Sequence, residues 1–363
     1  MISHSPRYLN GKEHQVRIPN KRFFAKFDMA KNIRVSDYLY SWIFDNTQFN
    51  NFTLDFDSST LTRYGSQEGA KKGYNVHKPG RNSHHPLMAF VADVKLVANF
   101  WLRSGNSSAC EGFVPFLEDT LGKLKNKTVG LLRMDSGFYS KTIFEYLEKR
   151  ALNYIISAKF YEPIQQMIAQ NTVWLALDKG IEIAEISYQG VGWEKPRRMA
   201  VVRQKIQDKP NAPGKTLKLF EEEAIYNQYR YSAYVTNMTL SATEIWRLYR
   251  GRADSENRIK ELKYDFGLDS FNLKDFYGTE AALTIAMLAY NLMALFRIFI
   301  LNSKIQHTLS TLRYKTFAMG AYFEQVGDKY ILKLALHLKR REWFDGLWQK
   351  SNTTQFPFQF SNA

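Results

Sequence analysis

The order of strand and helix patterns in residues 51–158 is the feature that most restricts the fold of this chain. The segment FTLDFDSST alternates apolar and polar side chains, which predicts a strand with Leu54 and Phe56 on one face. Six further elements follow: strands at 87–94 and 96–103, a helix from 108 to 125, a strand at 128–134, a helix at 141–150 and a strand at 153–158. The order β-β-β-α-β-α-β predicts an α/β domain built on a mixed sheet.

Acidic residues stand on two of these strands at places suited to chemistry. Asp55 and Asp57 share the face of the first strand that Leu54 and Phe56 leave free. They belong either to a solvated face or to a metal site at the strand end; we favour Asp57 as the ligand and keep Asp55 as the alternative. Asp135 follows a buried strand, and an acid at the carboxyl end of such a strand is a common site for chemistry in α/β sheets.

A third candidate acid lies on a helix that we expect at residues 241–263. Ser241 and Glu244 have the spacing of a capping box at its start. Four residues fall within an arc of about 60° on this helix: Tyr249, Arg252, Glu256 and Lys263. The stripe is either a solvated face with an i to i+4 ion pair, or a carboxylate flanked by groups that hold phosphates. Its length of about 21 Å suits a nucleic-acid backbone.

Residues 159–240 show short alternating runs broken by turn residues, which predicts a β-rich insertion. The runs lie at 181–188, 199–204, 216–220 and 229–235, with a proline- and glycine-containing loop at 210–214. Within the insertion, Trp193 is followed by Lys195, Arg197 and Arg198. These residues form either a β-turn with an exposed aromatic, or a site where Trp193 stacks on an unpaired or flipped base while the cations hold phosphates.

The charge balance indicates a polyanionic partner. The 363 residues contain 50 Lys and Arg against 35 Asp and Glu, a formal net charge of +15. The basic residues are spread along the chain, which favours nucleic acid over a membrane surface. Cys110 is the single cysteine, so the sequence excludes an internal disulfide and a cysteine-based zinc cluster, and it fits a reducing compartment.

Residues 281–301 have the length of a membrane span, but we interpret them as a core helix. Asn291 and Arg297 interrupt the apolar run, and the chain around it is strongly charged. We therefore expect no membrane partner.

The spacing Y-x2-R-x3-E-x6-K on the helix at 241–263 resembles that of the DDE transposases of bacterial insertion sequences, in the branch whose glutamate helix carries these four residues. The resemblance extends to the D-S-S-T segment at Asp57, to Gly65, Gln67, Glu68 and Gly69, to His85-Pro86-Leu87, to the second aspartate segment and to the apolar helix after Lys263. It implies a ribonuclease-H-like mixed sheet flanked by helices and interrupted by the β-rich insertion.

The resemblance also implies the chemistry and the partners. Asp57, Asp135 and Glu256 would bind two Mg²⁺ or Mn²⁺ ions, since carboxylate oxygens prefer these hard cations. Water would cut the element's end, and the freed 3′ hydroxyl would attack target DNA. The expected DNA contacts are Tyr249, Arg252, Lys260, Lys263, Trp193, Arg197 and Arg198. The expected partners are double-stranded DNA and a second copy of the chain, and the expected location is the bacterial cytoplasm, at the nucleoid.

We expect four regions and keep two alternative functions open. The regions are a short N-terminal part (1–50), expected to be a shortened DNA-binding part, the first part of the catalytic domain (51–158), the insertion (159–240) and the second catalytic part with the glutamate helix (241–363). One alternative is a shortened, inactive transposase that acts as a DNA-binding repressor. The other is a ribonuclease-H-like nuclease, which would cut DNA without strand transfer.

Overall fold

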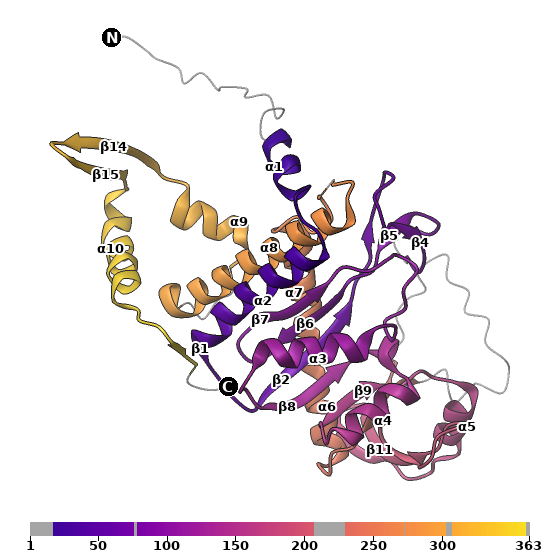
Figure 1. The fold of residues 1–363 in the computed structure, drawn as a ribbon. Coiled ribbons are helices and arrows are strands. Elements are labelled where there is room, and N and C mark those ends of the chain that lie inside the picture. Colours follow the sequence, from indigo (N-terminus) through magenta and orange to yellow (C-terminus); the bar gives the residue numbers. More distant parts are fainter. Residues whose placement is uncertain (1–16, 76–77, 207–228, 272, 303–306, 361–363) are drawn as a thin grey trace.

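A nine-stranded mixed sheet forms the centre of the computed structural model, which describes residues 17–75, 78–206, 229–271, 273–302 and 307–360 (Figure 1). Its strand order is β10-β11-β12-β13-β9-β8-β2-β6-β7. In chain order these strands are β2 (Phe52–Ser58), β6 (Leu87–Val91), β7 (Leu96–Trp101), β8 (Val129–Met134), β9 (Tyr154–Ser157), β10 (Leu175–Asp178), β11 (Ile181–Tyr188), β12 (Arg197–Lys205) and β13 (Tyr229–Thr236).

The ribonuclease-H-like half of the sheet confirms the predicted element order. Strand β2 lies in the middle, antiparallel to β6 and parallel to β8, while β6 and β7 form a hairpin and β8 runs parallel to β9. Helices α3 (Phe113–Leu124) and α4 (Lys141–Lys149) connect these strands as expected. The predicted start of the helix at residue 108 is wrong: Ser108 and Glu111, which have the spacing of a capping box, form a backbone turn, and α3 begins after Gly112, whose φ is +69°.

The insertion is rich in strands as predicted, and it extends the central sheet. Strand β13 pairs antiparallel with β9, so β13, β12, β11 and β10 continue the sheet outward. Helix α5 (Glu162–Gln170) precedes them and was not expected. The strand expected at 216–220 and the loop at 210–214 lie outside the described residues.

The two faces of the β2 region differ in character. On one face, Phe56 contacts the rings of Phe113 and Phe116 from α3 and belongs to the main apolar core. On the other face lie Asp55 and Asp57, together with helices α6 (Ala242–Arg250) and α7 (Ala253–Tyr264). The sheet therefore separates an apolar layer from a charged one.

Two helices complete the layer beside β7, the edge strand. Helices α2 (Met29–Asp45) and α8 (Phe276–Leu295) contact each other, and α8 contacts β7. Helix α8 continues as η4 (Phe296–Leu301), and Phe276–Leu301 is the one described helix whose length and composition would suit a membrane span. Its side chains Leu283, Met287 and Tyr290 lie in the main core, as expected for a core helix.

Asn291, the polar residue inside α8, bonds to the edge strand. Its side-chain amide accepts from the Val97 N–H at 2.7 Å and donates to the Val97 carbonyl at 2.9 Å. Both Val97 groups face away from β6 at an irregular step of the hairpin, where the register shifts between Ala89 and Phe90. Asn291 therefore satisfies backbone groups that an apolar side chain would leave unpaired.

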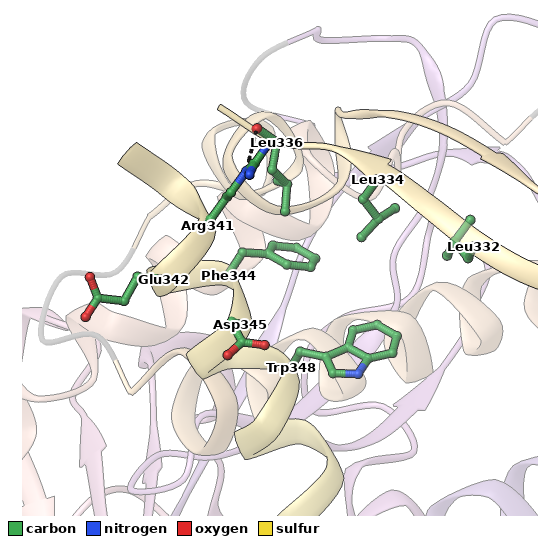
Figure 2. Close-up of a pocket in the computed structure, with 8 residues that line it drawn as sticks. All are labelled: Leu332, Leu334, Leu336, Arg341, Glu342, Phe344, Asp345 and Trp348. Carbon is green, nitrogen blue, oxygen red and sulfur yellow. Dashed lines mark hydrogen bonds between the residues drawn. The ribbon is translucent and has the colours of Figure 1, made fainter. Parts of the chain in front are cut away.

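The C-terminal part extends away from the sheet (Figure 1). It contains α9 (Leu309–Leu312), η5 (Arg313–Phe317), the hairpin β14 (Gly320–Val326) and β15 (Lys329–Ala335), helix α10 (Leu338–Thr353) and β16 (Phe358–Gln359). The last strand returns to pair with β1 (Thr47–Gln48). Between β15 and α10 lies an apolar groove of about 730 Å³, lined by Leu332, Leu334, Phe344 and Trp348 among others (Figure 2).

A second, three-stranded sheet follows β2. It consists of β3 (Leu61–Thr62), β4 (Lys71–Lys72) and β5 (Asn82–His84), in the order β3-β5-β4, and we call it the small sheet. Helix α1 (Arg17–Phe24) precedes α2, and a short helix η1 (Ser136–Phe138) lies between β8 and α4.

Replacement of Asn291 by Leu tests the bond between α8 and β7. The two Val97 backbone groups would lose their partners in the core, so we expect the free energy of unfolding to fall by about 2–4 kcal/mol in denaturant titration. The matched control is Leu292→Asn on the same helix, where the side chain is 45% exposed and the change should cost less than about 1 kcal/mol. Equal losses in the two variants would show that Asn291 has no special role.

Candidate active site

Asp55 is a structural residue in this fold. Its Oδ1 accepts from Arg133 Nε at 2.6 Å, and its Oδ2 accepts from Arg133 Nη2 at 2.9 Å and from the Ser255 hydroxyl at 2.7 Å. Asp55 is fully buried, so a solvated face is excluded for this residue. Asp55 therefore joins β2 to β8 and α7, whereas Asp57 shares the Arg252 guanidinium with Asp135 and Glu256, which favours Asp57 over Asp55 as the candidate ligand.

The helix expected at 241–263 is two helices, because the chain bends at Gly251 and Arg252. The capping box at Ser241 is present as predicted. Arg133 Nη1 donates to the Leu248 carbonyl at 2.5 Å, and a Cβ on Gly251 would lie 2.4 Å from that same nitrogen. The Arg133 guanidinium therefore packs closely against Gly251, and a larger residue there would require the guanidinium to move.

Three side chains attach α7 to the central sheet and to the loop after β2. Ser255 bonds to Asp55, and Arg258 donates to the Val91 and Ala92 carbonyls at the end of β6. Lys263 Nζ donates to the Thr60 carbonyl at 2.9 Å, just after β2. These bonds hold the helix across the end of β2, where Asp57 lies.

The guanidinium of Arg252 lies among the three predicted acids. Arg252 Nη2 is 2.8 Å from Asp57 Oδ2 and 3.8 Å from Asp135 Oδ2, and Nη1 is 3.9 Å from Glu256 Oε1. The structure thus places acids from β2, from the end of β8 and from α7 around one guanidinium, and we call Arg252 and these three acids the acidic pocket. Their side chains are 9%, 38% and 62% exposed, so the pocket opens toward solvent on the Glu256 side.

The pKa values of Asp57 and Arg252 are both shifted in the pocket. Burial raises the pKa of Asp57 to about 7; Arg252 opposes this shift, while Asp135 and Glu256 add to it. Burial by itself would lower the pKa of Arg252, but Asp57 and the other nearby acids raise it above its ordinary value. The guanidinium therefore acts as the counter-ion of the pocket.

The residue types in the pocket fit a divalent metal, although in this structure the three carboxylates lie around the Arg252 guanidinium. All three acids offer carboxylate oxygens, the ligands that Mg²⁺ and Mn²⁺ prefer. Among the described residues, no three acidic, histidine or cysteine side chains are already grouped as a metal-binding set. Arg252 Nε is buried and has no hydrogen-bond partner, which makes its present position incompletely satisfied.

The remaining residues of the predicted stripe take different positions. Tyr249 packs against Tyr234 with ring centroids 4.3 Å apart, and burial raises its pKa to about 12. Lys263 is half-buried next to the site, and burial lowers its pKa while Asp269 and Asp57 oppose the shift. Lys260 is exposed on the outer side of α7. The bend and the helical rotation thus separate residues that an unbroken helix would align.

Trp193 and Arg197 are core residues, contrary to both readings of the sequence. The Trp193 ring is 9% exposed and contacts the rings of Tyr139, Phe144 and Tyr188. The Arg197 guanidinium lies 4.7 Å from the Trp193 ring centroid and makes a two-point ion pair with Glu148, at 2.7 and 3.0 Å. Neither the exposed aromatic nor the base-stacking site is formed.

Arg198 is also engaged within the insertion, since it pairs with Glu185 at 2.5 Å and donates to the Met238 carbonyl. Its expected phosphate contact would require this pair to open.

Sequence reasoning missed the residues that position the site. Arg133, Ser255 and Arg258 set the place of α7, yet none was expected to matter. A signal existed for Arg133: it is the one charged residue in the buried strand β8, and burial of a charge requires a partner.

Comparison with known proteins identifies the family. A family model described as transposase DDE domain group 1 matches residues 20–353. None of the curated protein sequences matches this chain. Among solved structures, it is similar to a piggyBac transposase determined in a synaptic complex with hairpin DNA, at 12% identity and a TM-score of 0.45, over 73% of this chain and 52% of that one. The chain thus spans about half the length of that transposase. Because the family match covers most of its residues, the chain belongs to the DDE transposases of domain group 1.

Proposed function

We propose that this chain is a metal-dependent DNA transposase of the insertion-sequence type that carries the Y-R-E-K spacing. One observation supports this above all: Asp57, Asp135 and Glu256, far apart in sequence, lie within ion-pair distance of a single guanidinium. Three acids with one arginine leave an excess of negative charge that a divalent cation would neutralise. The proposed setting is the cytoplasm of a bacterium, at the nucleoid.

The three carboxylates are the groups that would hold Mg²⁺ or Mn²⁺, two ions by the resemblance. When bound, these ions would neutralise the phosphodiester and assist displacement at phosphorus. Asp57 supplies the buried ligand on rigid β2, and Asp135 is oriented by the Gly137 N–H, which donates to its Oδ1 at 2.8 Å. Glu256, the most exposed of the three acids, is proposed to be the one that an arriving DNA strand reaches first.

Arg252 is proposed to change partners when DNA binds. In the free protein it pairs with Asp57, and its Nε lacks an acceptor. A DNA phosphate would offer oxygens to the whole guanidinium, including Nε. Movement toward phosphate would free Asp57 for the cation, so DNA and metal would favour each other's binding. Lys263 would hold a neighbouring phosphate, and Tyr249 would lie near the strand end.

The proposed reaction has two steps in the same pocket. Water would attack the phosphodiester at the element's end, which leaves a 5′ phosphate on the flanking DNA and a 3′ hydroxyl on the element. That hydroxyl would then attack a target phosphodiester and release the target strand's 3′ hydroxyl. The same three carboxylates would hold the cations that assist displacement in both steps. The net charge of +15 supports double-stranded DNA as the partner.

A homodimer on DNA is also proposed, and the C-terminal groove supports it. The groove between β15 and α10 is apolar, and α10 has no buried residue among those described. A two-stranded hairpin with both edges free is marginally stable by itself, and exposed apolar grooves mark association sites. A second copy would cover this surface while each copy holds one DNA end.

Replacement of Glu256 by Gln tests the catalytic assignment. We expect cleavage of a duplex that carries the terminal repeats flanking the coding region to fall at least about 1,000-fold in Mg²⁺, equivalent to about 4 kcal/mol, with DNA affinity nearly unchanged. The matched control is Asp254→Asn, since Asp254 lies on the same turn and is 63% exposed against 62% for Glu256. A Glu256→Gln variant that cuts at the parental rate would end the assignment, and cutting without strand-transfer products would favour a nuclease.

Replacement of Arg252 by Gln tests its role as an internal counter-ion. In this variant Asp57 has no ion-pair partner. With EDTA present to remove metal ions, we expect the variant to melt at a lower temperature than the parental protein, since removal of one partner of a buried ion pair costs roughly 3–5 kcal/mol of stability. Added Mn²⁺ should then stabilise this variant more than the parental protein, since no guanidinium competes for the carboxylates. Arg252→Lys keeps the charge and should behave more like the parental protein. Equal Mn²⁺ stabilisation of all three proteins would contradict competition.

The dimer is tested by placing a charge in the C-terminal groove. Trp348 lines the groove and is 55% exposed, so Trp348→Glu should convert the protein–DNA complex from two protein copies to one in light scattering. Trp343→Glu on the same helix, at a position outside the groove lining and 43% exposed, is the control and should leave two copies. A single protein copy in the parental complex would contradict the proposal.

A further inference from the structure

The small sheet carries an exposed group of cations and aromatic rings that the site described above does not use. Lys71 and Lys72 form β4, and Lys78 and Arg81 lie in the segment leading to β5; all four are exposed. Tyr64 and Tyr74 are 68% and 76% exposed. We call these six exposed residues together the basic face of the small sheet.

The cations of this face have no acidic partners in the described chain. None of the four makes an ion pair with a described residue, in contrast to Arg197 and Arg198 of the insertion. Among residues 61–75 and 78–84, Glu68 is the one acid, and its carboxylate accepts from the Phe276 N–H at 2.8 Å. The face therefore carries positive charge that nothing within the described chain neutralises.

The aromatic rings of the basic face lie next to its cations. Lys78 Nζ is 4.7 Å from the centre of the Tyr64 ring, and the Arg81 guanidinium is 5.9 Å from it. These contacts hold two cations around one exposed ring. In nucleic-acid binding, cations contact phosphates and aromatic rings contact bases or sugars, so this combination of residue types suits a nucleic-acid surface.

The small sheet is held rigidly, although its outer face is exposed. Arg63 donates to His84 at 3.1 Å and to the Asp269 carbonyl at 3.2 Å, and His84 bonds to the Glu68 carbonyl. A Cβ on Gly73 would lie 1.9 Å from the Gly105 carbonyl oxygen, so two backbones meet closely there. The basic face is thus presented in a fixed shape.

A short chain of bonds joins the basic face to the acidic pocket. The Thr60 hydroxyl donates to the Tyr74 carbonyl at 3.2 Å, while the Thr60 carbonyl accepts from Lys263. Thr60 lies three residues after Asp57. A DNA strand whose phosphate reaches Asp57 and Lys263 would therefore continue over the small sheet.

We propose that the basic face of the small sheet is a DNA-binding surface, which holds the duplex that flanks the bond being cut. Lys71, Lys72, Lys78 and Arg81 contact phosphates, and Tyr64 and Tyr74 contact sugar or base. The inference rests on the proposed DNA transposase function and assigns the DNA contacts that Trp193 and Arg197, buried in the insertion, do not provide.

The test measures the salt dependence of binding by the full chain to a fluorescein-labelled 30-base-pair DNA duplex of mixed sequence. The double variant Lys71→Ala, Lys72→Ala should bind about tenfold or more weakly near 100 mM NaCl, and the slope of log affinity against log salt should fall by about 2, about one for each phosphate contact. The charge-matched control is Lys329→Ala, Lys339→Ala in the C-terminal part, where both side chains are exposed. It should keep the parental slope.

A second pair of variants tests the aromatic contact. Tyr64→Ala should weaken binding several-fold without changing the salt slope, since a ring contact releases no counter-ions. Tyr314 is also 68% exposed and lies 5.7 Å from the Arg340 guanidinium, so Tyr314→Ala is its matched control and should bind as the parental protein does. Melting temperatures confirm that each variant is folded.

The outcomes separate this inference from the proposed function. If the parental protein binds the duplex with a steep salt slope, but the small-sheet variants bind equally well or lose no more than their controls, the basic face is not the DNA surface and only this inference fails. If the parental protein shows no salt-dependent binding to DNA, the transposase proposal fails together with it.

Discussion

Arg133 and Asp55 form a buried ion pair that joins β8 to β2 and reaches the bend between α6 and α7. The two residues are direct neighbours in the register of the parallel strands, so the pair forms as the sheet forms. Ser255 and the Leu248 carbonyl satisfy the remaining polar groups of this pair. A buried charge without such partners would lower the free energy of unfolding by roughly several kcal/mol. Replacement of any partner of this pair should therefore destabilise the fold. The place of α7, and with it of Arg252 and Glu256, follows from this constraint.

In the proposed function, the acidic pocket and the basic face of the small sheet have different roles in binding a polyanion. An acidic pocket by itself repels DNA, whereas unpaired cations attract it over a distance set by the salt concentration. Arg252 connects the two tasks, because it neutralises the acids in the free protein and can offer its charge to phosphate in the complex. Burial raises the pKa of Asp57 to about 7 even with Arg252 beside it, and a bound divalent cation would favour the ionised carboxylate further.

Local patterns in the sequence predicted the strand and helix order of residues 51–158 and the capping box at Ser241. The set of three acids came from the family resemblance, and its role stays a proposal. The interruption between α6 and α7 was not predicted, although a glycine inside a helical pattern is one signal for it. The contact of Arg133 with the Leu248 carbonyl joins residues more than 100 positions apart, so local patterns do not show it. Trp193 and Arg197 looked like a nucleic-acid site because aromatic and basic residues are adjacent; their partner, Glu148, is close only in the folded chain. The small sheet was overlooked because its cations are scattered over a stretch with little periodic pattern.

We propose that the Asp57, Asp135 and Glu256 carboxylates exchange the Arg252 guanidinium for divalent cations when DNA binds. The most direct test is a crystal structure of the chain with Mn²⁺ and a DNA end, in which anomalous scattering locates the metal. The account predicts Mn²⁺ bonded to these three carboxylates and Arg252 moved onto a DNA phosphate. Mn²⁺ bound elsewhere, or an intact pair between Arg252 and Asp57 with DNA in place, would contradict it.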